Sequence, residues 1–180
     1  MCPASYNGID DFLLGPETSQ VTYIIAEIRP EHDQSICRII KSVGAEYGAV
    51  GDGFGPSDPE VLCMSQHYGK DNGSIYYIAS MAGQVVGGAG ISGFKGSHEL
   101  CELRKLFLLP GYRGLGIGEA LARRCLHYAE NWGYKRCYLD TMSNMEAAMS
   151  LYRKLGFIRL DKPLEGTAHT GCDIGMIKYL

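Results

Sequence analysis

The chain lacks the residue patterns that define several common classes of protein. Its seven cysteines include no Cys-x-x-Cys pair, and its five histidines are dispersed along the sequence. The clustered ligand spacings of a structural zinc site are therefore absent, and no metal is predicted. Scattered cysteines of odd number indicate reduced, mostly buried thiols in a cytoplasmic protein.

Positive charge is also scarce. The net charge is −3, and the first basic residue is Arg29. No overall positive field exists to attract nucleic acid or anionic lipid, and no basic flank marks a signal or transit peptide. The uncharged stretch 72–94 holds six glycines and a turn at 81–84. It predicts a β-hairpin and no membrane span.

The 180 residues suit one α/β domain at residues 21–180, after an irregular or flexible extension at residues 1–20. Strands are predicted at residues 21–28, 74–80, 84–94, 99–109, 136–141, 157–160 and 172–179. Helices are predicted at 31–43, at 58–68, between the glycines at 114–118 and Gly133, and from a capping box at 143–146 to Leu155.

The segment from Leu106 to Gly118 carries the most information about function. A strand there runs through a glycine-rich turn directly into a helix. Free N–H groups and the positive end of the helix dipole suit a phosphate or pyrophosphate. Glycine lets the backbone approach the phosphate oxygens closely, and Arg113 adds a nearby cation.

This turn departs from two common nucleotide-binding motifs, each at one specific residue. The dinucleotide fingerprint needs Gly or Ala at position 119, which is Glu119. A Walker loop needs Lys at position 117, which is Ile117. A tight turn that binds no ligand stays open as an alternative at this point.

Two motifs resemble signatures of the GNAT N-acetyltransferase superfamily. Arg113-Gly-Leu-Gly-Ile-Gly118 is similar to the Arg/Gln-x-x-Gly-x-Gly/Ala signature, and Leu151-Tyr-Arg-Lys-Leu-Gly-Phe157 to a second signature. The resemblance implies a mixed, mostly antiparallel central sheet, splayed at the middle, with helices on both faces. It implies acetyl-CoA as co-substrate, held by Leu106, Phe107, Leu108, Arg113, Gly114, Leu115, Gly116, Ile117 and Gly118.

Tyr152 occupies the position of the usual general acid in this family. When an amine attacks the thioester, coenzyme A leaves as a thiolate, and a phenol of pKa about 10 stays protonated at neutral pH and can donate to it. The N–H of Leu108 is the predicted oxyanion donor. Without the resemblance, the pattern favours an ordinary core residue of its helix; with the resemblance, it favours the general acid.

A base is needed because amines are mostly protonated at neutral pH. Glu102 and Asp140 are the candidates, Glu102 first, with a water relay as a third option. Either carboxylate could instead bind the substrate cation or pair with Arg104 or Lys105. Met145 stands where many family members hold a cofactor-binding Asn. His169 and Asp173 lie in the loop before the last strand and could touch substrate, but a solvated loop is the favoured interpretation.

The expected function is acetyl-CoA-dependent acetylation of a primary amine of a small molecule, by direct attack in a ternary complex. A protein or peptide acceptor and a non-catalytic acyl-CoA sensor are the alternatives. No nucleic acid or membrane partner is expected, and a homodimer stays open.

Overall fold

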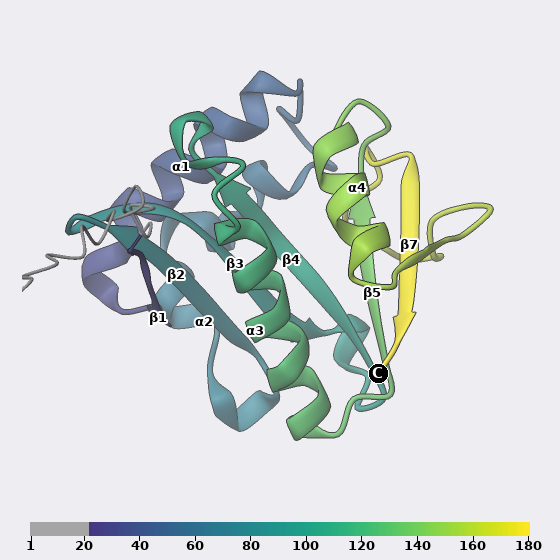
Figure 1. Cartoon of the computed structure of the whole chain (residues 1–180). Helices are drawn as coiled ribbons and strands as arrows, with labels where there is room; N and C mark the ends of the chain where they lie inside the picture. Colours follow the sequence, from purple (N-terminus) through teal and green to yellow (C-terminus); the bar gives the residue numbers. More distant parts are fainter. Residues whose placement is uncertain (1–21) are drawn as a thin grey trace, which may run out of the picture.

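The computed structural model describes residues 22–180, and the predicted extension at 1–20 lies outside the described residues. Seven strands form one sheet in the order β1-β2-β3-β4-β5-β7-β6 (Figure 1). The strands are β1 (Ile24–Glu27), β2 (Ile75–Met81), β3 (Gln84–Gly93), β4 (Leu100–Leu108), β5 (Arg136–Thr141), β6 (Ile158–Arg159) and β7 (Ile174–Tyr179). Among the described strands, β4 and β5 are the one pair that runs parallel, which agrees with the predicted, mostly antiparallel sheet.

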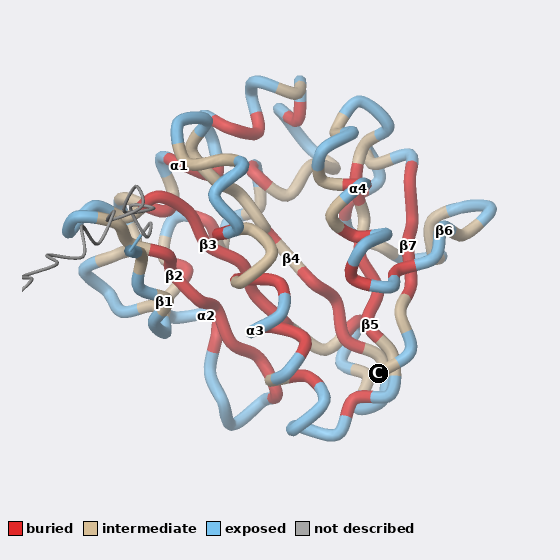
Figure 2. Tube along the Cα trace, viewed as in Figure 1, coloured by how far each residue is buried: buried red, intermediate tan, exposed pale blue. Residues whose placement is uncertain are grey.

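Helices cover both faces of this sheet, which confirms the predicted architecture. They are α1 (Asp33–Glu46), α2 (Met64–His67), α3 (Ile117–Trp132) and α4 (Glu146–Lys154). The apolar stripe of α3 packs over β2, β3 and β4, while α1 lies against β3 and β4 (Figure 1). The middle of the sheet is consequently buried on both faces, as the red tube in Figure 2 shows.

The hairpin predicted within the uncharged stretch is present. β2 and β3 are joined by Ala82 and Gly83, with φ of 49° and 77°. Positive φ at both central residues is the geometry of a type I′ turn, which matches the twist of the flanking strands. Among residues 22–180, no helix has the length and apolar character needed to cross a membrane.

The sheet opens between β4 and β5. Their pairing is confined to Leu100–Glu102 against Arg136–Tyr138. Past that point β4 contains a bulge at Lys105, which has a φ of 52°. The Tyr76 hydroxyl donates to the Lys105 carbonyl at 2.8 Å and holds the bulge. A bulge bends its strand and increases the local twist. The two strands therefore diverge, and the gap between them becomes available for ligands.

Gly88 on β3 allows the close packing that supports this bulge. A Cβ there would lie 2.5 Å from the Tyr76 ring and 2.7 Å from the Tyr77 carbonyl oxygen. We expect Gly88→Ala to lower the free energy of unfolding by about 1–3 kcal/mol through overpacking. Urea denaturation measures this loss. Gly69→Ala, which introduces a Cβ into open space, should change stability far less; equal losses would contradict the packing explanation.

Three predicted element boundaries are wrong. The first helix continues past Gly44 to Glu46, because Gly44 serves close packing: a Cβ there would lie 2.5 Å from Pro56. The predicted helix at 58–68 is a 3-10 turn followed by the single turn of α2, since Cys63 between them is non-helical. The predicted capping box at 143–146 does not form. Met145 is the N-cap of α4, and the Ser143 N–H binds Asp173 instead.

Candidate active site

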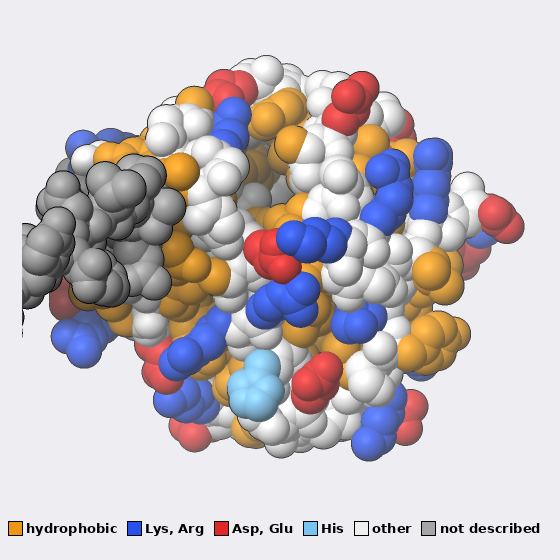
Figure 3. Space-filling model, in the orientation of Figure 1, with side chains coloured by type: hydrophobic (Ala, Val, Ile, Leu, Met, Phe, Trp, Pro, Cys, Tyr) orange, Lys and Arg blue, Asp and Glu red, His pale blue; other side chains and the backbone are white. Residues whose placement is uncertain are grey.

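A groove of about 500 Å³ lies between the start of α3 and α4. Leu106 and Leu108 form part of its wall, and Gly114, Gly116 and Gly118 form another part. Figure 3 shows the surface hollowed above β4, with apolar side chains inside the hollow. The glycine-rich turn predicted to bind phosphate therefore borders an open groove.

The turn leaves the first N–H groups of α3 exposed to this groove. Gly114 and Gly116 have φ of 77° and 79°, in the left-handed region that favours glycine. Gly116 is the N-cap of α3 and supplies no side chain, so that no side-chain oxygen caps the helix. The first-turn N–H groups have no acceptor within a helix. Together with the helix dipole they form a site suited to an anion.

The predicted cofactor residues fall into three groups. Those that line the groove are Leu106, Leu108, Arg113, Gly114, Gly116 and Gly118. Phe107 lines a second cavity, described below. The Leu115 side chain is partly exposed and the Ile117 side chain is in the core, and both lie outside the groove lining. Only the backbone atoms of Leu115 and Ile117 could therefore contact a ligand at the turn.

Arg113 is more constrained than a free phosphate-binding cation. Its Nε donates to the Leu108 carbonyl at 3.2 Å, and its Nη2 donates to Glu46 at 2.8 Å. Its guanidinium also lies 5.7 Å from the centre of the Tyr47 ring. Arg113 thus connects the end of α1 with the end of β4 while it lines the groove.

Sequence reasoning missed a set of charges at the groove rim. Glu119 accepts from Lys154 at 2.6 Å and from Arg123 at 2.8 Å. Lys154 and Glu119 line the groove. Lys154 lies within the second family-like motif, which was the available signal, but its pairing with Glu119 depends on how α3 and α4 pack.

A second cavity, of about 70 Å³, lies deeper between the diverging strands. Glu102 and Phe107 of β4 face it, as do Asp140 of β5 and Tyr152 of α4. Three residues line both this cavity and the groove: Tyr47, Leu106 and Met145. A ligand in the groove can therefore reach the second cavity at the gap between the strands.

Tyr152 is placed where a proton donor could act. Its side chain is 7% exposed and lines the second cavity, and its ring packs edge-on against Phe157. Burial raises the pKa of the Tyr152 hydroxyl, which keeps the phenol protonated. Within residues 22–180 the hydroxyl has no hydrogen-bond partner, so its proton is available to a ligand.

The two candidate bases differ in accessibility. The Glu102 side chain is 12% exposed, and that of Asp140 is 1% exposed. The Asp140 carboxylate accepts hydrogen bonds from the Tyr138 and Thr167 hydroxyls. Glu102 is paired with Arg104 at 3.4 Å. Both carboxylates line the second cavity, but Glu102 is the easier one to reach.

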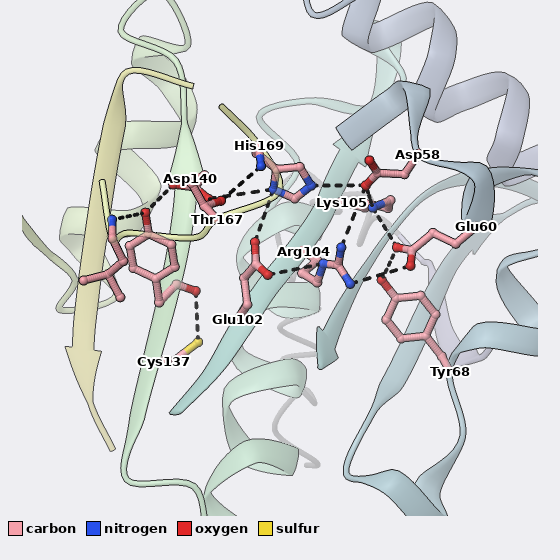
Figure 4. Close-up of polar contacts among 12 residues, drawn as sticks. Asp58, Glu60, Tyr68, Glu102, Arg104, Lys105, Cys137, Asp140, Thr167 and His169 are labelled. Carbon is pink, nitrogen blue, oxygen red and sulfur yellow. Dashed lines mark hydrogen bonds and ion pairs between the residues drawn. The ribbon is translucent and has the colours of Figure 1, made fainter. Parts of the chain in front are cut away.

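The expectation that His169 lies in a solvated loop is wrong. The residue is 6% exposed, and its ring lies between carboxylates of three separate segments (Figure 4). Its Nδ1 is 3.3 Å from Glu102 and 3.8 Å from Asp140, while Nε2 is 3.1 Å from Asp58. Asp173, by contrast, is exposed and caps the Ser143 N–H.

Burial alone would lower the pKa of His169, but the carboxylates of Asp140, Asp58 and Glu102 outweigh it and raise the pKa to about 10. The ring is therefore an imidazolium at neutral pH. Although the ligand spacings of a metal site are absent from the sequence, the fold brings Glu102, Asp140 and His169 together, with ligand atoms within 4.8 Å. These three groups already form an ion-pair set, because the imidazolium lies against both carboxylates.

The ion-pair set continues to the opposite side of the cavity (Figure 4). Lys105, 1% exposed, binds Asp58 at 2.6 Å and Glu60 at 2.7 Å. Arg104 lies 3.6 Å from Glu60, and its buried Nε has no hydrogen-bond partner among the described residues. Burial raises the pKa of Asp58, but hydrogen bonds from His169 and Lys105 outweigh it and lower the pKa to about 2. In the sequence, Asp58 marks only the start of the helix predicted at 58–68.

Asn144 is the neighbour of Met145, and its side chain makes a hydrogen bond within the protein. Its side-chain amide donates to the Tyr47 carbonyl at 2.9 Å. This bond joins the segment after α1 to the segment before α4, across the gap between the strands. Met145 itself lines both cavities.

Comparison with known proteins agrees with this geometry. The model of the acetyltransferase (GNAT) family matches residues 45–157. An uncharacterized N-acetyltransferase of Escherichia coli, YjgM, is 36% identical over 87% of this chain and 95% of its own length. The N-acetylaspartate synthetase of Xenopus tropicalis is 38% identical over 52% of this chain and 34% of its own length.

Solved structures share the fold. A GNAT acetyltransferase from Staphylococcus aureus has a TM-score of 0.75 at 19% identity, covering 88% of this chain and 99% of its own. The Salmonella typhimurium acetyltransferase YncA, solved with acetyl-CoA, has a TM-score of 0.71 at 18% identity, covering 88% and 94%. The N-acetyltransferase class and the acetyl-CoA co-substrate that the motifs implied are those of the matched family. This chain belongs to the GNAT family of acetyltransferases.

Proposed function

We propose that the protein transfers the acetyl group of acetyl-CoA to a primary amine of a small molecule, by direct attack in a ternary complex. The observation that carries the proposal is the junction of the two cavities at Tyr47, Leu106 and Met145. Coenzyme A in the groove would present its thioester at this junction. An amine in the second cavity would then face the carbonyl carbon without a covalent enzyme intermediate.

The backbone at the end of β4 can stabilise the oxyanion. The Leu109 N–H donates to the Val86 carbonyl at 2.9 Å. Because donors alternate in direction along an antiparallel strand, the neighbouring Leu108 N–H is directed away from β3, toward the gap. A fixed N–H donor aimed at a developing negative charge is a common means of transition-state stabilisation. This direction supports the proposal that the Leu108 N–H is the oxyanion donor.

The protons of the reaction have candidate carriers. Nitrogen attacks the carbonyl carbon, the C–S bond breaks, and Tyr152 would donate its proton to the leaving thiolate. Cys172, which also lines the second cavity, is unsuited to carry the acetyl group. Burial raises its pKa to about 12, so that it is a thiol and not a nucleophilic thiolate at neutral pH.

The size and closure of the second cavity favour a small acceptor. Two loops close it on one side, where the Gly171 N–H donates to the Gly53 carbonyl at 2.9 Å. A relative that covers part of the chain is named for a small product, N-acetylaspartate. A panel of amines, amino acids and peptides, assayed for coenzyme A release and for acetylated product, tests the proposal. Acetylation of peptides alone would contradict it, and binding of coenzyme A without any transfer would favour the sensor alternative.

We propose Glu102 as the group that takes the amine proton, directly or through water. If so, Glu102→Gln should lower kcat/KM by about 10²-fold and flatten its rise with pH, while coenzyme A affinity is unchanged. The amide is nearly isosteric and loses only the charge and the ability to accept a proton. Initial rates across a pH series provide the measurement.

Asp140→Asn is the matched control for this prediction. Asp140 lines the same cavity but is engaged by two hydroxyls. We expect its variant to keep the pH-dependent rise. If the rise disappears in Asp140→Asn and survives in Glu102→Gln, the roles of the two carboxylates are reversed. A cytoplasmic location stays a prediction from the cysteine pattern.

A further inference from the structure

His169 is the only described histidine that lines the second cavity, and no step of the proposed reaction has used it. Its segment, between β6 and β7, brings the ring against groups from three other parts of the chain. Nδ1 faces Glu102 on β4 and Asp140 on β5, while Nε2 faces Asp58, which precedes the 3-10 turn at Pro59–Leu62. Figure 4 shows the ring lying between the two sides of the cavity.

The arrangement forms a continuous chain of polar atoms from the cavity to the surface. Glu102 Oε1 lies 3.3 Å from Nδ1, and Asp58 Oδ2 lies 3.1 Å from Nε2. The Asp58 side chain is 23% exposed, which gives the far end of the chain access to water. Because each imidazole nitrogen faces a carboxylate, the ring can receive a proton at Nδ1 from Glu102 and give one up at Nε2 to Asp58.

From this geometry we propose that His169, oriented by Asp58, moves the acceptor's proton from Glu102 out of the cavity to solvent. The inference rests on the proposed amine acetylation, and it makes His169 a positioning residue that acts through Glu102. The step requires no covalent change in the enzyme, only proton transfers along atoms that are already adjacent.

Charge supplies the reason for the proton to move. Three carboxylates surround the ring, those of Asp58, Glu102 and Asp140, and a fourth, Glu60, lies behind them. Two positively charged side chains, Arg104 and Lys105, form ion pairs with members of this group. Without a ligand, the imidazolium is the third cation. An acceptor ammonium that enters beside Glu102 adds a positive charge next to the imidazolium. Like charges at short range favour loss of one proton, and the exposed Asp58 gives the imidazolium proton its exit.

The protons then balance over one turnover. Acceptor binding releases the imidazolium proton through Asp58 to water. Glu102 takes one proton from the ammonium and passes it to Nδ1, which restores the imidazolium. The neutral amine attacks, and the second nitrogen proton reaches the coenzyme A thiolate by way of Tyr152. The products are an N-acetylated amine, coenzyme A as thiol, and one proton in solution.

Proton release on acceptor binding is the most direct test. Parent protein saturated with coenzyme A is mixed with an amine from the panel that it acetylates, in weak buffer with a pH indicator at pH 8. We expect release of up to about one proton per site in the parent and none in His169→Gln. His98→Gln, which changes an exposed histidine, should release as many protons as the parent. Equal release in His169→Gln overturns the proposal.

Kinetic rescue separates proton transfer from packing. We expect His169→Gln and His169→Ala to lower kcat by about 10-fold or more. Added imidazole should restore kcat in His169→Ala, increasingly as the pH rises and more of the imidazole is the free base. A loss of kcat that imidazole does not reverse would mean that the ring only packs the loop. Asp58→Asn keeps the ring, and it should also reduce proton release; unchanged release in a folded Asp58→Asn would contradict the exit route.

A titration of the His169 ring by NMR, in protein without ligands, is independent of any acceptor. An imidazolium that persists well above pH 7 is expected, and a neutral ring at pH 7 would overturn the inference. If the parent acetylates no amine, the proposed function fails, whereas this titration still reports on the charge of His169. The two failures are therefore distinguishable.

Discussion

Replacing Gly116 by valine should abolish coenzyme A binding while the protein stays folded. The residue has a φ of 79°, and a β-branched side chain is strained in that region. The added side chain would also project at the first N–H groups of α3, where the pyrophosphate is expected to bind. A Cβ at this position meets no protein atom within 4 Å, so that the folded protein has room for it. Calorimetric titration with coenzyme A measures the loss.

Gly133→Val provides the matched control for backbone strain. Gly133 caps the other end of the same helix with a φ of 105°, and a Cβ there also meets open space. We expect both variants to lose about 1–2 kcal/mol of stability, since each forces a side chain into the left-handed region. Only Gly116→Val should lose coenzyme A. If Gly116→Val binds coenzyme A as tightly as the parent does, the phosphate site lies elsewhere.

Tyr152→Phe is expected to lower kcat by about 10²–10⁴-fold, the usual range for loss of a general acid. Coenzyme A affinity should change little, because the ring and its contact with Phe157 remain. The cost in stability should be small, since the hydroxyl has no partner among the described residues. Steady-state rates and a thermal unfolding curve test both expectations.

Tyr128→Phe is a comparable change away from the junction. The Tyr128 hydroxyl donates to the Ser74 carbonyl at 3.4 Å and lines neither cavity. Its variant should retain the parent kcat. A Tyr152→Phe variant with full kcat would show that Tyr152 is only a core residue, as its place in the apolar stripe of α4 also allows.

Local sequence patterns predicted the scaffold well because they depend on contacts near in sequence. The strand at Arg136–Thr141 and the turn at Ala82-Gly83 follow from alternation and turn chemistry. The glycine turn before α3 was identifiable because positive φ and an open helix start both require glycine. Predicted helix starts are less informative: Asp58 begins the helix predicted at 58–68, but its carboxylate binds Lys105 and His169.

The acceptor side of the site could not be predicted in the same way. His169 and Asp58 are 111 positions apart, and nothing local to either residue shows that they meet. The bulge at Lys105 on β4 is similarly hidden, because its carbonyl accepts a hydrogen bond from Tyr76 on β2, and β3 lies between these two strands. Nothing in the sequence distinguishes a lysine that is buried between two carboxylates from an ordinary surface lysine. Long-range ion pairs of this kind are visible only once the sheet is assembled.

Initial rates measured while acetyl-CoA and a reactive amine are both varied would test direct transfer at the cavity junction most directly. Because direct transfer requires both ligands to be bound together at Tyr47, Leu106 and Met145, we expect double-reciprocal lines that intersect, and no acetylated protein after incubation with acetyl-CoA alone. Parallel lines, together with an acetyl group on the protein that passes to the amine, would contradict it.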